Sequence, residues 1–390
     1  MARIGIDARM LGKGYGLGRY VEQLLRGINQ YGGEHQYVVF VLGAALSRDR
    51  IMPDGKKCRM QNAELLTTCE VVETNIPWYS VEEQMKFSSI IKQQKVDLMH
   101  FPHWNIPLLY NDPYIVTIHD LTMYHYLRLE ATTHGPVVYW VKDMAHRLVV
   151  KHSVEKARHI ITTSEFTKQD IHQTLGVPLE KMTTVYQGVG INDQKSGNNE
   201  VDIKSRFGIT KSYVLYVGAA YPHKNIDGLL NAWELFCEKY GDEYQLVLAG
   251  KDSVFYQKLL EQFDHLIIRS SVVFTNFVTD EELAVLYKSA RTFVFPSLYE
   301  GFGIPPLEAI QCGVPVVASN TSCLPEVLGE GAYYVDPKSP QAIADGLYLV
   351  CTDEEMRYAL KQQGREELKR YSFETFARQT ISLYTKESQI

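Results

Sequence analysis

The chain has 390 residues, of which 45% are hydrophobic and 22% charged, and it carries a formal net charge of −6. This length and composition are typical of a water-soluble enzyme with two domains, and the negative charge argues against a general nucleic-acid-binding protein. No apolar stretch has the length of a membrane span or the pattern of a signal peptide. Because the six cysteines form neither a C-x-x-C pair nor a dense disulfide framework, we expect a cytoplasmic protein.

A glycine-rich segment follows the first predicted strand. Residues 4–8 are apolar and run into the loop 12–20, after which residues 21–28 have the apolar spacing of a helix. The dinucleotide fingerprint G-x-G-x-x-G is not matched, since Arg19 occupies the place of the third glycine. Such a loop lets a ligand approach the backbone closely, although an ordinary turn between a strand and a helix has the same composition.

Short β-rich runs alternate with helical stretches through the rest of the first half. The predicted strands are residues 37–42, 96–101, 114–118, 160–163 and 183–186. This alternation predicts a parallel sheet covered on both faces by helices, with ligands at the carboxyl ends of the strands. Two histidine-containing clusters, 100–105 and 117–121, fall at such ends. We favour no metal there, because no cysteine or carboxylate spacing accompanies the histidines, and His119 can also be held by Asp120.

Residues 139–159 are predicted to form one long helix with a local positive charge. Between positions 142 and 158 it carries five Lys and Arg residues against two acidic ones, a net of three positive charges. On an acidic protein this excess fits contact with anionic lipid headgroups, although a solvated helix face has the same composition.

The second half repeats the architecture of the first. Residues 192–204 are polar and helix-poor, which predicts a linker. Beyond it the predicted strands are residues 213–217, 244–249, 272–274, 292–295 and 314–318, with helices at 226–239 and 280–290. We therefore expect an N-terminal domain of residues 1–190 and a C-terminal domain of residues 191–372.

The loop after the first strand of the second half contains Lys224 and Asn225. Asn225 can cap the following helix, and Lys224 lies beside that helix N-terminus. A fixed positive charge and free N–H groups would then converge on one anion, such as a phosphate. The alternative is an ordinary surface lysine.

A second glycine loop follows the strand at 292–295. Gly301 and Gly303 bracket Phe302, and Pro305 and Pro306 stand where a helix would begin, since proline is tolerated in a first helical turn. This strand–loop–helix pattern places N–H groups and a helix dipole where they favour a phosphate.

Two carboxylates flank this loop. Glu300 precedes it, and Glu308 is expected in the first helical turn. Because a carboxylate repels a phosphate, these side chains should contact something neutral and rich in hydroxyl groups, such as a sugar or a ribose. The alternative is that Glu308 complements the helix dipole and that Glu300 merely ends a strand.

The segment 300–309, E-G-F-G-I-P-P-L-E-A, resembles the donor-binding segment of the retaining GT-B glycosyltransferases of family 4. The likeness continues through G-V-P-V-V-A-S at 313–319 and P-E-V at 325–327. The resemblance implies an α/β fold of the GT-B type, with two Rossmann-like domains whose parallel sheets face each other across a cleft. It also implies that a helix at residues 373–390 packs back on the first domain.

The resemblance assigns roles to individual residues. It implies that Glu300 contacts the transferred sugar, Glu308 the nucleotide ribose and Lys224 the donor diphosphate, while His119 lies at the far side of the sugar. His119, Lys224 and Glu300 are thus the expected catalytic residues. The other expected donor-binding positions are Gly16, Gly18, Gly188, Phe277, Val278, Gly301, Phe302, Gly303 and Ile304.

The chain departs from the family pattern at three positions. His223 replaces a common Arg, Ala219 stands where several members carry a second phosphate-binding Arg, and Asn276 stands where a Gly is usual. The diphosphate would then be held by Lys224 and backbone N–H groups alone, or by a further basic residue such as Arg9 or Arg19.

The overall pattern looks most like bacterial mannosyltransferases of surface-polysaccharide assembly. It implies transfer of a hexose, with mannose from GDP-mannose as the first choice and UDP-glucose or UDP-GlcNAc as rival donors, to a glycan or polyprenyl-diphosphate-linked acceptor. No D-x-D triplet occurs, so we expect no obligatory metal or other cofactor. The expected location is the cytoplasm, at the cytoplasmic face of the membrane. The alternatives are a phosphorylase or epimerase of the same fold, and a non-catalytic sugar-nucleotide-binding homologue.

Overall fold

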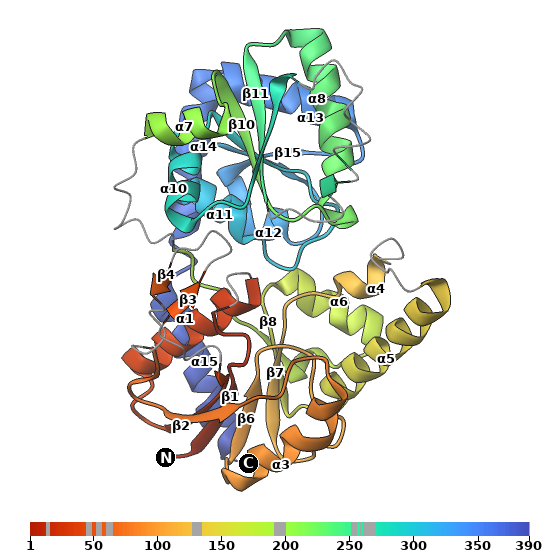
Figure 1. The fold of residues 1–390 in the computed structure, drawn as a ribbon, viewed down its shortest axis with the longest axis vertical. Helices are drawn as coiled ribbons and strands as arrows, with labels where there is room; N and C mark the ends of the chain where they lie inside the picture. The colour runs from red at the N-terminus through yellow and green to blue at the C-terminus, as the bar shows by residue number, and fades with distance from the viewer. Residues whose placement is uncertain are drawn as a thin grey trace. The chain divides into compact units, whose positions relative to one another are not determined.

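The structure is a computed structural model. It describes residues 1–390 except 13–15, 44–48, 52–56, 60–64, 127–134, 191–199, 251–255, 258, 260–269 and 390. Backbone contacts divide the chain into two compact units (Figure 1). Unit 1 comprises Met1–Leu121, Gly135–Gly188 and Ser372–Ile390, and unit 2 comprises Thr122–His134 and Val189–Tyr371. Thr122–His134, which the sequence placed in the first domain, is thus grouped with unit 2.

The sheet of unit 1 is parallel, with seven strands among the described residues in the order β5-β2-β1-β6-β7-β8-β9. These strands are β1 (Arg3–Asp7), β2 (Gln36–Leu42), β5 (Glu70–Thr74), β6 (Leu98–Phe101), β7 (Tyr114–Ile118), β8 (His159–Thr162) and β9 (Met182–Thr184). Every residue of β6, β7 and β8 is buried, as expected for parallel strands covered on both faces. Because β1 pairs with both β2 and β6, the strand order changes direction between β1 and β6.

The longer helices of unit 1 are α1 (Gly16–Tyr31), α3 (Ser88–Gln93), α5 (Gly135–Lys156), α6 (Glu165–Leu175) and α15 (Phe373–Ser388). Shorter elements are the antiparallel pair β3 (Asp49–Ile51) and β4 (Lys57–Arg59), the π-helical turn η2 (Glu83–Phe87) and the 3-10 turn η4 (Leu179–Lys181). Ser164 caps the start of α6, because its side chain accepts the Thr167 N–H. Helix α5 ends at Lys156, and His159 already belongs to β8, so the predicted end of this helix at residue 159 is wrong.

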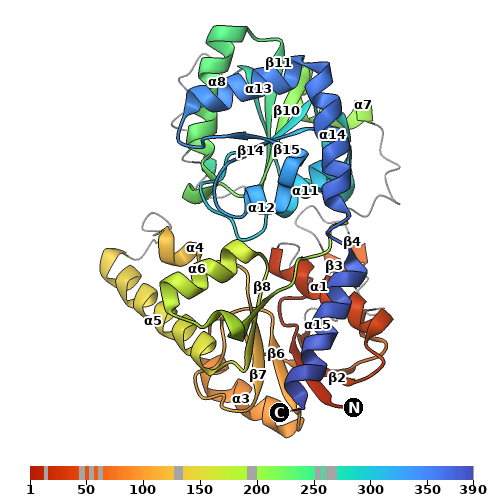
Figure 2. The same ribbon diagram turned by 180° about the vertical axis from the view of Figure 1, so that it is seen from behind.

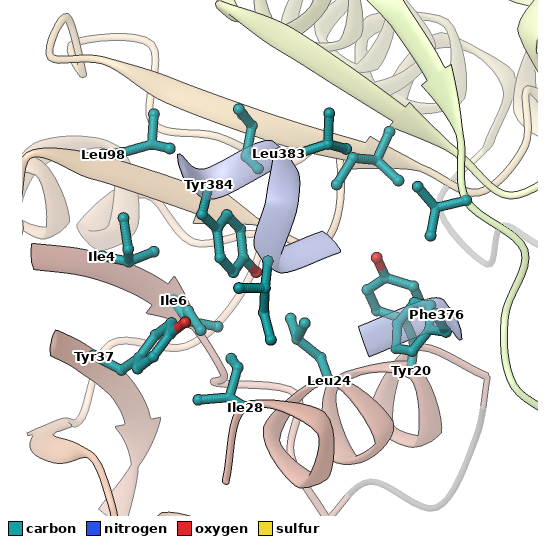
Figure 3. Packing of buried hydrophobic residues seen from close by; sticks show 14 residues of the cluster. Ile4, Ile6, Tyr20, Leu24, Ile28, Tyr37, Leu98, Phe376, Leu383 and Tyr384 are labelled. Carbon is teal, nitrogen blue, oxygen red and sulfur yellow. The ribbon is translucent and has the colours of Figure 1, made fainter. Parts of the chain in front are cut away.

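The last helix, α15, is part of the core of unit 1. It lies along α1, and both ends of the chain are found in this unit (Figure 2). A Cβ atom on Gly27 of α1 would lie 2.5 Å from the Ala377 Cβ of α15, so the missing side chain permits this close approach. Ile4, Tyr20 and Tyr384 belong to one buried cluster that joins β1, α1 and α15 (Figure 3).

The sheet of unit 2 is also parallel, with six strands among the described residues in the order β12-β11-β10-β13-β14-β15. These strands are β10 (Ser212–Val217), β11 (Tyr244–Ala249), β12 (Val272–Asn276), β13 (Thr292–Phe295), β14 (Val316–Ser319) and β15 (Ala332–Val335). The two Rossmann-like sheets confirm the predicted α/β fold class. β10 pairs with both β11 and β13. The strand order therefore changes direction between β10 and β13, at the centre of the sheet.

The helices of unit 2 connect these strands. They are α4 (Thr122–His125), α7 (Glu200–Phe207), α8 (Ile226–Tyr240), α10 (Asp280–Ser289), α11 (Ile304–Gln311), α12 (Leu324–Leu328), α13 (Pro340–Thr352) and α14 (Glu354–Leu368), with 3-10 turns η6 (Pro222–Lys224) and η8 (Gly329–Gly331). The predicted linker 192–204 is partly wrong, since α7 begins at Glu200, while residues 192–199 lie outside the described residues. In the part of the chain that the structure describes, every helix is too short or too polar to cross a bilayer.

Candidate functional site

Two loops of unit 2 meet at the carboxyl end of its sheet. The loop after β10 ends in η6, and the loop after β13 covers residues 296–303. The Leu298 N–H donates to the His223 carbonyl at 2.8 Å and joins the two loops. Because β10 and β13 are neighbours where the strand order changes direction, these loops occupy the place where open parallel sheets bind ligands.

The two side chains predicted to act in these loops contact each other. The Lys224 Nζ lies 2.5 Å from the Glu300 Oε1, and the side chains are 19% and 11% exposed. The Lys224 Nζ also lies 5.5 Å from the centre of the Phe295 ring. The structure therefore brings Lys224 and Glu300 together, and this contact was not predicted.

Asn225 positions this part of the site in a way that differs from the prediction. It occupies the N-cap position of α8 in the left-handed conformation, with φ 59°, but its side chain makes no capping bond. Instead its Nδ2 donates to the carbonyls of Pro296 at 3.0 Å and Pro337 at 2.7 Å. The predicted capping bond is thus wrong, and Asn225 ties the loop after β10 to the loop after β13.

The glycine loop before α11 depends on Gly303. This residue has φ 93°, and a Cβ there would lie 2.9 Å from the Leu324 side chain, so that only glycine fits without strain. Because Pro305 and Pro306 have no N–H, the first turn of α11 offers only the N–H groups of Gly303 and Ile304. An anion at this helix end would therefore meet few backbone donors, and the charge of Lys224 gains importance.

Phe302 is buried, and its ring packs edge-on against Tyr371 with centroids 5.5 Å apart. Gly301 is also buried. The Phe302 side chain therefore anchors the loop to unit 2, and only its backbone is suited to the predicted donor contact.

Glu308 lies deeper in the helix than predicted. It is the fifth residue of α11, so the expectation that it belongs to the first helical turn is wrong. Its side chain is buried, and the Tyr287 hydroxyl donates to its Oε2 at 3.1 Å. A carboxylate in this position does not complement the helix dipole through its first turn, which weakens the structural alternative for Glu308.

The end of β12 leads to Phe277 and Val278, two of the predicted donor-binding positions. Asn276 has φ 58°, a left-handed conformation that glycine adopts freely and asparagine tolerates, which explains an Asn where the family usually has a Gly. Phe277 is 50% exposed and Val278 is partly buried. Thr279 then caps α10 in a capping box with Glu282.

Aromatic rings surround His223, which stands where the family commonly has an Arg. His223 is buried, and its ring stacks on Tyr221 with centroids 5.8 Å apart, while Tyr126 lies 6.1 Å away. Tyr126 also contacts Tyr299, with centroids 6.0 Å apart. His223 is therefore a packed side chain of unit 2 and no simple replacement for an arginine charge.

The carboxyl edge of the sheet in unit 1 carries His119. Its Nε2 lies 2.9 Å from the Pro102 carbonyl, so Nε2 carries the proton and donates it. Burial lowers the pKa of His119, which favours the neutral ring. The remaining nitrogen, Nδ1, is then a hydrogen-bond acceptor suited to a hydroxyl group. The contact with Pro102 shows that the ring is not held by Asp120 alone.

A buried polar network lies next to His119. The Tyr20 ring meets the His119 ring edge-on with centroids 4.7 Å apart. The Thr117 hydroxyl lies 3.0 Å from the Tyr20 hydroxyl and 2.9 Å from the His100 Nε2, and the His100 Nδ1 lies 2.7 Å from the Tyr384 hydroxyl. Burial lowers the pKa of His100 to about 3, so this ring is neutral. Among the described residues, no three His, Cys, Asp or Glu side chains gather in a possible metal site.

The predicted glycines of unit 1 differ in their surroundings. Gly16 is the exposed first residue of α1, and Gly18 is buried in its first turn, so the helix begins inside the predicted loop 12–20. Gly14 lies outside the described residues. A Cβ on Gly188 would lie 2.9 Å from the Phe373 Cα, which gives Gly188 a packing role at the start of α15. Ligand contact by Gly16, Gly18 and Gly188 stays a prediction.

Arg9 does not hold the diphosphate, so this alternative is wrong. Its side chain is fully buried, with its Nε 2.8 Å from the Asp7 Oδ1 and its Nη2 2.7 Å from the Asp7 Oδ2. The same Nη2 lies 2.5 Å from the Glu83 Oε1. Arg9 therefore neutralises two buried carboxylates, and Arg19, in the first turn of α1, stays as the other basic candidate.

Family comparisons cover both halves of the chain. Residues 15–193 match the family described as Glycosyltransferase Family 4, and residues 199–367 match the family described as Glycosyl transferases group 1. The two matches meet near the boundary between Gly188 and Val189 that separates the units.

Two curated relatives come from bacterial surface-polysaccharide synthesis. The chain is 34% identical to O-antigen chain mannosyltransferase B of Escherichia coli over 60% of its own length and 61% of the relative. It is 30% identical to O-antigen chain mannosyltransferase RfbU of Salmonella typhimurium over 67% of its own length and 66% of the relative. The chain thus matches between three fifths and two thirds of the length of these relatives.

A solved structure has the same fold. Anabaena HepE, crystallised with UDP and glucose, has a TM-score of 0.72 to this chain at 18% identity, with 99% of this chain and 100% of HepE covered. This likeness bears on the fold alone.

Proposed function

The chain belongs to the family-4 glycosyltransferases, which have the GT-B fold, and from this premise we propose that it transfers a hexose from a nucleotide-diphosphate sugar to a hydroxyl group. The proposed acceptor is a glycan or a polyprenyl-diphosphate-linked oligosaccharide in cell-surface polysaccharide synthesis, handled at the cytoplasmic face of the membrane. Both halves of the GT-B architecture are matched, which supports a two-domain transferase over a lone binding domain.

The contact between Lys224 and Glu300 is the main support for this proposal. It lies beside β10 and β13, where the strand order of unit 2 changes direction. A cation and a carboxylate side by side suit a ligand with an anionic part next to a part rich in hydroxyl groups, and a sugar diphosphate is such a ligand. Lys224 and the backbone of residues 301–304 would hold the diphosphate. Glu300 would accept hydrogen bonds from the sugar, and Glu308 from the ribose.

The proposed reaction keeps the configuration of the sugar. The bond between the anomeric carbon and the diphosphate oxygen breaks, the acceptor oxygen bonds to the same face of that carbon, and the acceptor proton passes to the departing phosphate oxygen. Negative charge grows on the diphosphate, where Lys224 stabilises it by a preorganised interaction. Because Lys224 supplies this positive charge, we propose that no metal is obligatory. His119 would orient the sugar through its Nδ1 acceptor and is no general base.

GDP-mannose is the proposed donor. The two mannosyltransferases of O-antigen synthesis among the relatives support mannose. UDP-glucose and UDP-GlcNAc are the alternative donors. The UDP and glucose bound to HepE support a uridine diphosphate sugar as the alternative. Phe277 and Val278, at the proposed base position, do not distinguish a purine from a pyrimidine.

A thermal-shift panel tests the donor. Ligand at 100 times its Kd stabilises the folded state by about 2.7 kcal/mol, so GDP-mannose with EDTA should raise the unfolding midpoint by roughly 5–10 °C. Glu308→Ala should lose most of the shift caused by GDP, because the buried carboxylate would no longer meet the ribose. Glu366→Ala, which removes an exposed carboxylate of α14 paired with Lys369, is the matched control and should keep the shift.

The outcomes of this panel are distinct. A shift with UDP and its conjugates alone would keep the class and overturn GDP-mannose. A full GDP shift in Glu308→Ala would place the ribose elsewhere. No shift with any nucleotide would contradict the proposed function, and phosphate-dependent turnover would favour a phosphorylase.

We also propose that unit 1 rests on the membrane through α5, for a reason that differs from the charge count. Trp140, Met144 and Leu148 are exposed and spaced four residues apart, so they share one helix face. Much of the basic excess is paired within the helix, since the Arg147 Nε lies 2.7 Å from the Asp143 Oδ2 and Lys151 pairs with Glu155. An exposed Trp, Met and Leu row beside lysines suits the interface of an anionic bilayer.

Co-sedimentation with anionic vesicles tests this surface. Met144→Ser with Leu148→Ser should lower the bound fraction several-fold, because the apolar area that enters the interface is lost. Tyr358→Ser removes an equally exposed side chain of α14 and should leave binding unchanged. Equal vesicle binding by the wild type and the double variant would contradict the proposal.

A further inference from the structure

Lys224 and Glu300 form an ion pair with each other at the end of β10 and β13, where the strand order of unit 2 changes direction. The Lys224 Nζ and the Glu300 Oε1 are 2.5 Å apart although the residues are 76 positions apart in the chain. In a simple diphosphate site the lysine would have no ion-pair partner before the ligand binds. Here the Lys224 ammonium group already forms an ion pair with the Glu300 carboxylate. An ammonium group has three N–H donors, so an anion competes with Glu300 when it takes the donor that now points to this carboxylate.

The surroundings make this competition consequential. Glu300 is buried, and its N–H donates to the Ser322 hydroxyl at 3.2 Å, which fixes the backbone that carries it. Burial raises the pKa of the nearby Tyr216 hydroxyl and Cys323 thiol, and the charge of Glu300 raises both further. The Glu300 side chain is only 11% exposed, so its carboxylate lies in a poorly hydrated place, where a charge without a partner is unfavourable.

The ligand proposed above contains a partner for each member of the pair. A diphosphate is a stronger anionic partner for an ammonium group than one carboxylate, and sugar hydroxyl groups are donors for a carboxylate. A bare nucleoside diphosphate offers the first partner without the second. It would take Lys224 and leave Glu300 buried and unpaired.

We propose that the Lys224–Glu300 ion pair makes donor binding depend on the sugar. The diphosphate displaces Glu300 from Lys224, and the hydroxyl groups of the transferred sugar then satisfy Glu300. The pair disfavours the bare nucleoside diphosphate, which is the product, relative to the intact donor. This inference rests on the proposed function, and it adds that Glu300 selects against the bare diphosphate.

Calorimetric titration of GDP, UDP and their sugar conjugates tests the inference. Glu300→Gln keeps the shape and an acceptor oxygen but removes the charge that competes for Lys224. It should bind the bare diphosphate about tenfold more tightly than the wild type, the effect of releasing one charge-assisted hydrogen bond. The preference of the wild type for the sugar conjugate over the bare diphosphate should fall by a similar factor.

A second background separates competition from simple repulsion between Glu300 and phosphate. In Lys224→Met, where nothing is left to compete for, Glu300→Gln should change the affinity for the bare diphosphate less than about twofold. An equal gain in both backgrounds would overturn the inference in favour of repulsion. Weaker binding of the bare diphosphate by Glu300→Gln alone would overturn it too, because Glu300 would then position Lys224 for the anion.

Asp345→Asn is the matched charge control. Asp345 pairs with Lys239 at 3.0 Å near the far end of α8, about 20 Å along the helix from its start beside Lys224. It should leave all affinities unchanged. If the wild type binds no nucleotide at all, the proposed function fails. If it binds GDP or UDP but Glu300→Gln gains nothing, the function stands and this inference alone fails.

Discussion

Lys224→Met is expected to lower donor turnover by about 10²–10³-fold, the loss typical when one preorganised group that stabilises a developing negative charge is removed. The first turn of α11 has only the N–H groups of Gly303 and Ile304, and Arg9 is committed to Asp7 and Glu83. Among the described residues, Lys224 is thus the main positive charge at the loops after β10 and β13 that could stabilise the departing diphosphate. The measurement is release of the nucleoside diphosphate from the donor identified by the thermal-shift panel.

A second lysine, near the far end of α8, provides a control for the loss of a positive charge. Lys239→Met removes an exposed lysine near the far end of α8 and should leave turnover unchanged. Lys224→Arg, which keeps the charge but not the geometry, should recover part of the lost rate. Turnover of Lys224→Met within a few-fold of the wild type would show that another group, such as Arg19, holds the departing diphosphate.

The central strands could be predicted from the sequence because each is a short apolar run. The predicted limits of β7 (Tyr114–Ile118), β11 (Tyr244–Ala249) and β13 (Thr292–Phe295) agree with the structure. The strands β5 (Glu70–Thr74) and β15 (Ala332–Val335) were missed. Both are at a sheet edge, and β5 is largely exposed, so its sequence lacks the continuous apolar pattern of a strand covered on both faces.

The site was predicted in its parts, but the sequence did not reveal how they contact one another. Lys224 and Glu300 were each recognised from a local motif. Their contact depends on the adjacency of β10 and β13, and sheet order has no local signal. β10 was predicted as the first strand of a Rossmann-like domain, and the rule that ligands bind where the strand order reverses could then have suggested this adjacency.

Arg9 was misjudged for a related reason. A basic residue after a first strand has the same local pattern whether it faces a ligand or a buried carboxylate. Asp7 was the available signal, because an acidic residue within an otherwise buried strand needs a partner, and a residue two positions along can supply it. Glu83, 74 positions away, could not be foreseen from the local sequence.

The buried cluster of Arg9, Asp7 and Glu83 gives the largest expected effect on stability. Arg9→Met should destabilise unit 1 by roughly 3–5 kcal/mol, because it leaves two buried carboxylates without their cation. The loss extends to the loops that Glu83 holds, since its Oε2 accepts the Asn105 Nδ2 at 2.7 Å and the Tyr79 N–H at 2.9 Å. In calorimetry, the unfolding midpoint of unit 1 should fall by roughly 6–20 °C.

Two further variants decide whether the unpaired charges cause this loss. Adding Asp7→Asn and Glu83→Gln to Arg9→Met should restore much of the stability, because neutral side chains in the same place no longer require a cation. Arg26→Met breaks an exposed ion pair of the same unit, in which the Arg26 Nη2 lies 2.7 Å from the Glu22 Oε1 on the surface of α1. That change should stay within about 1 kcal/mol. If Arg9→Met unfolds close to the wild-type midpoint, the buried carboxylates are neutral or reach water, and the cluster does not hold the loops after β5 and β6 in place.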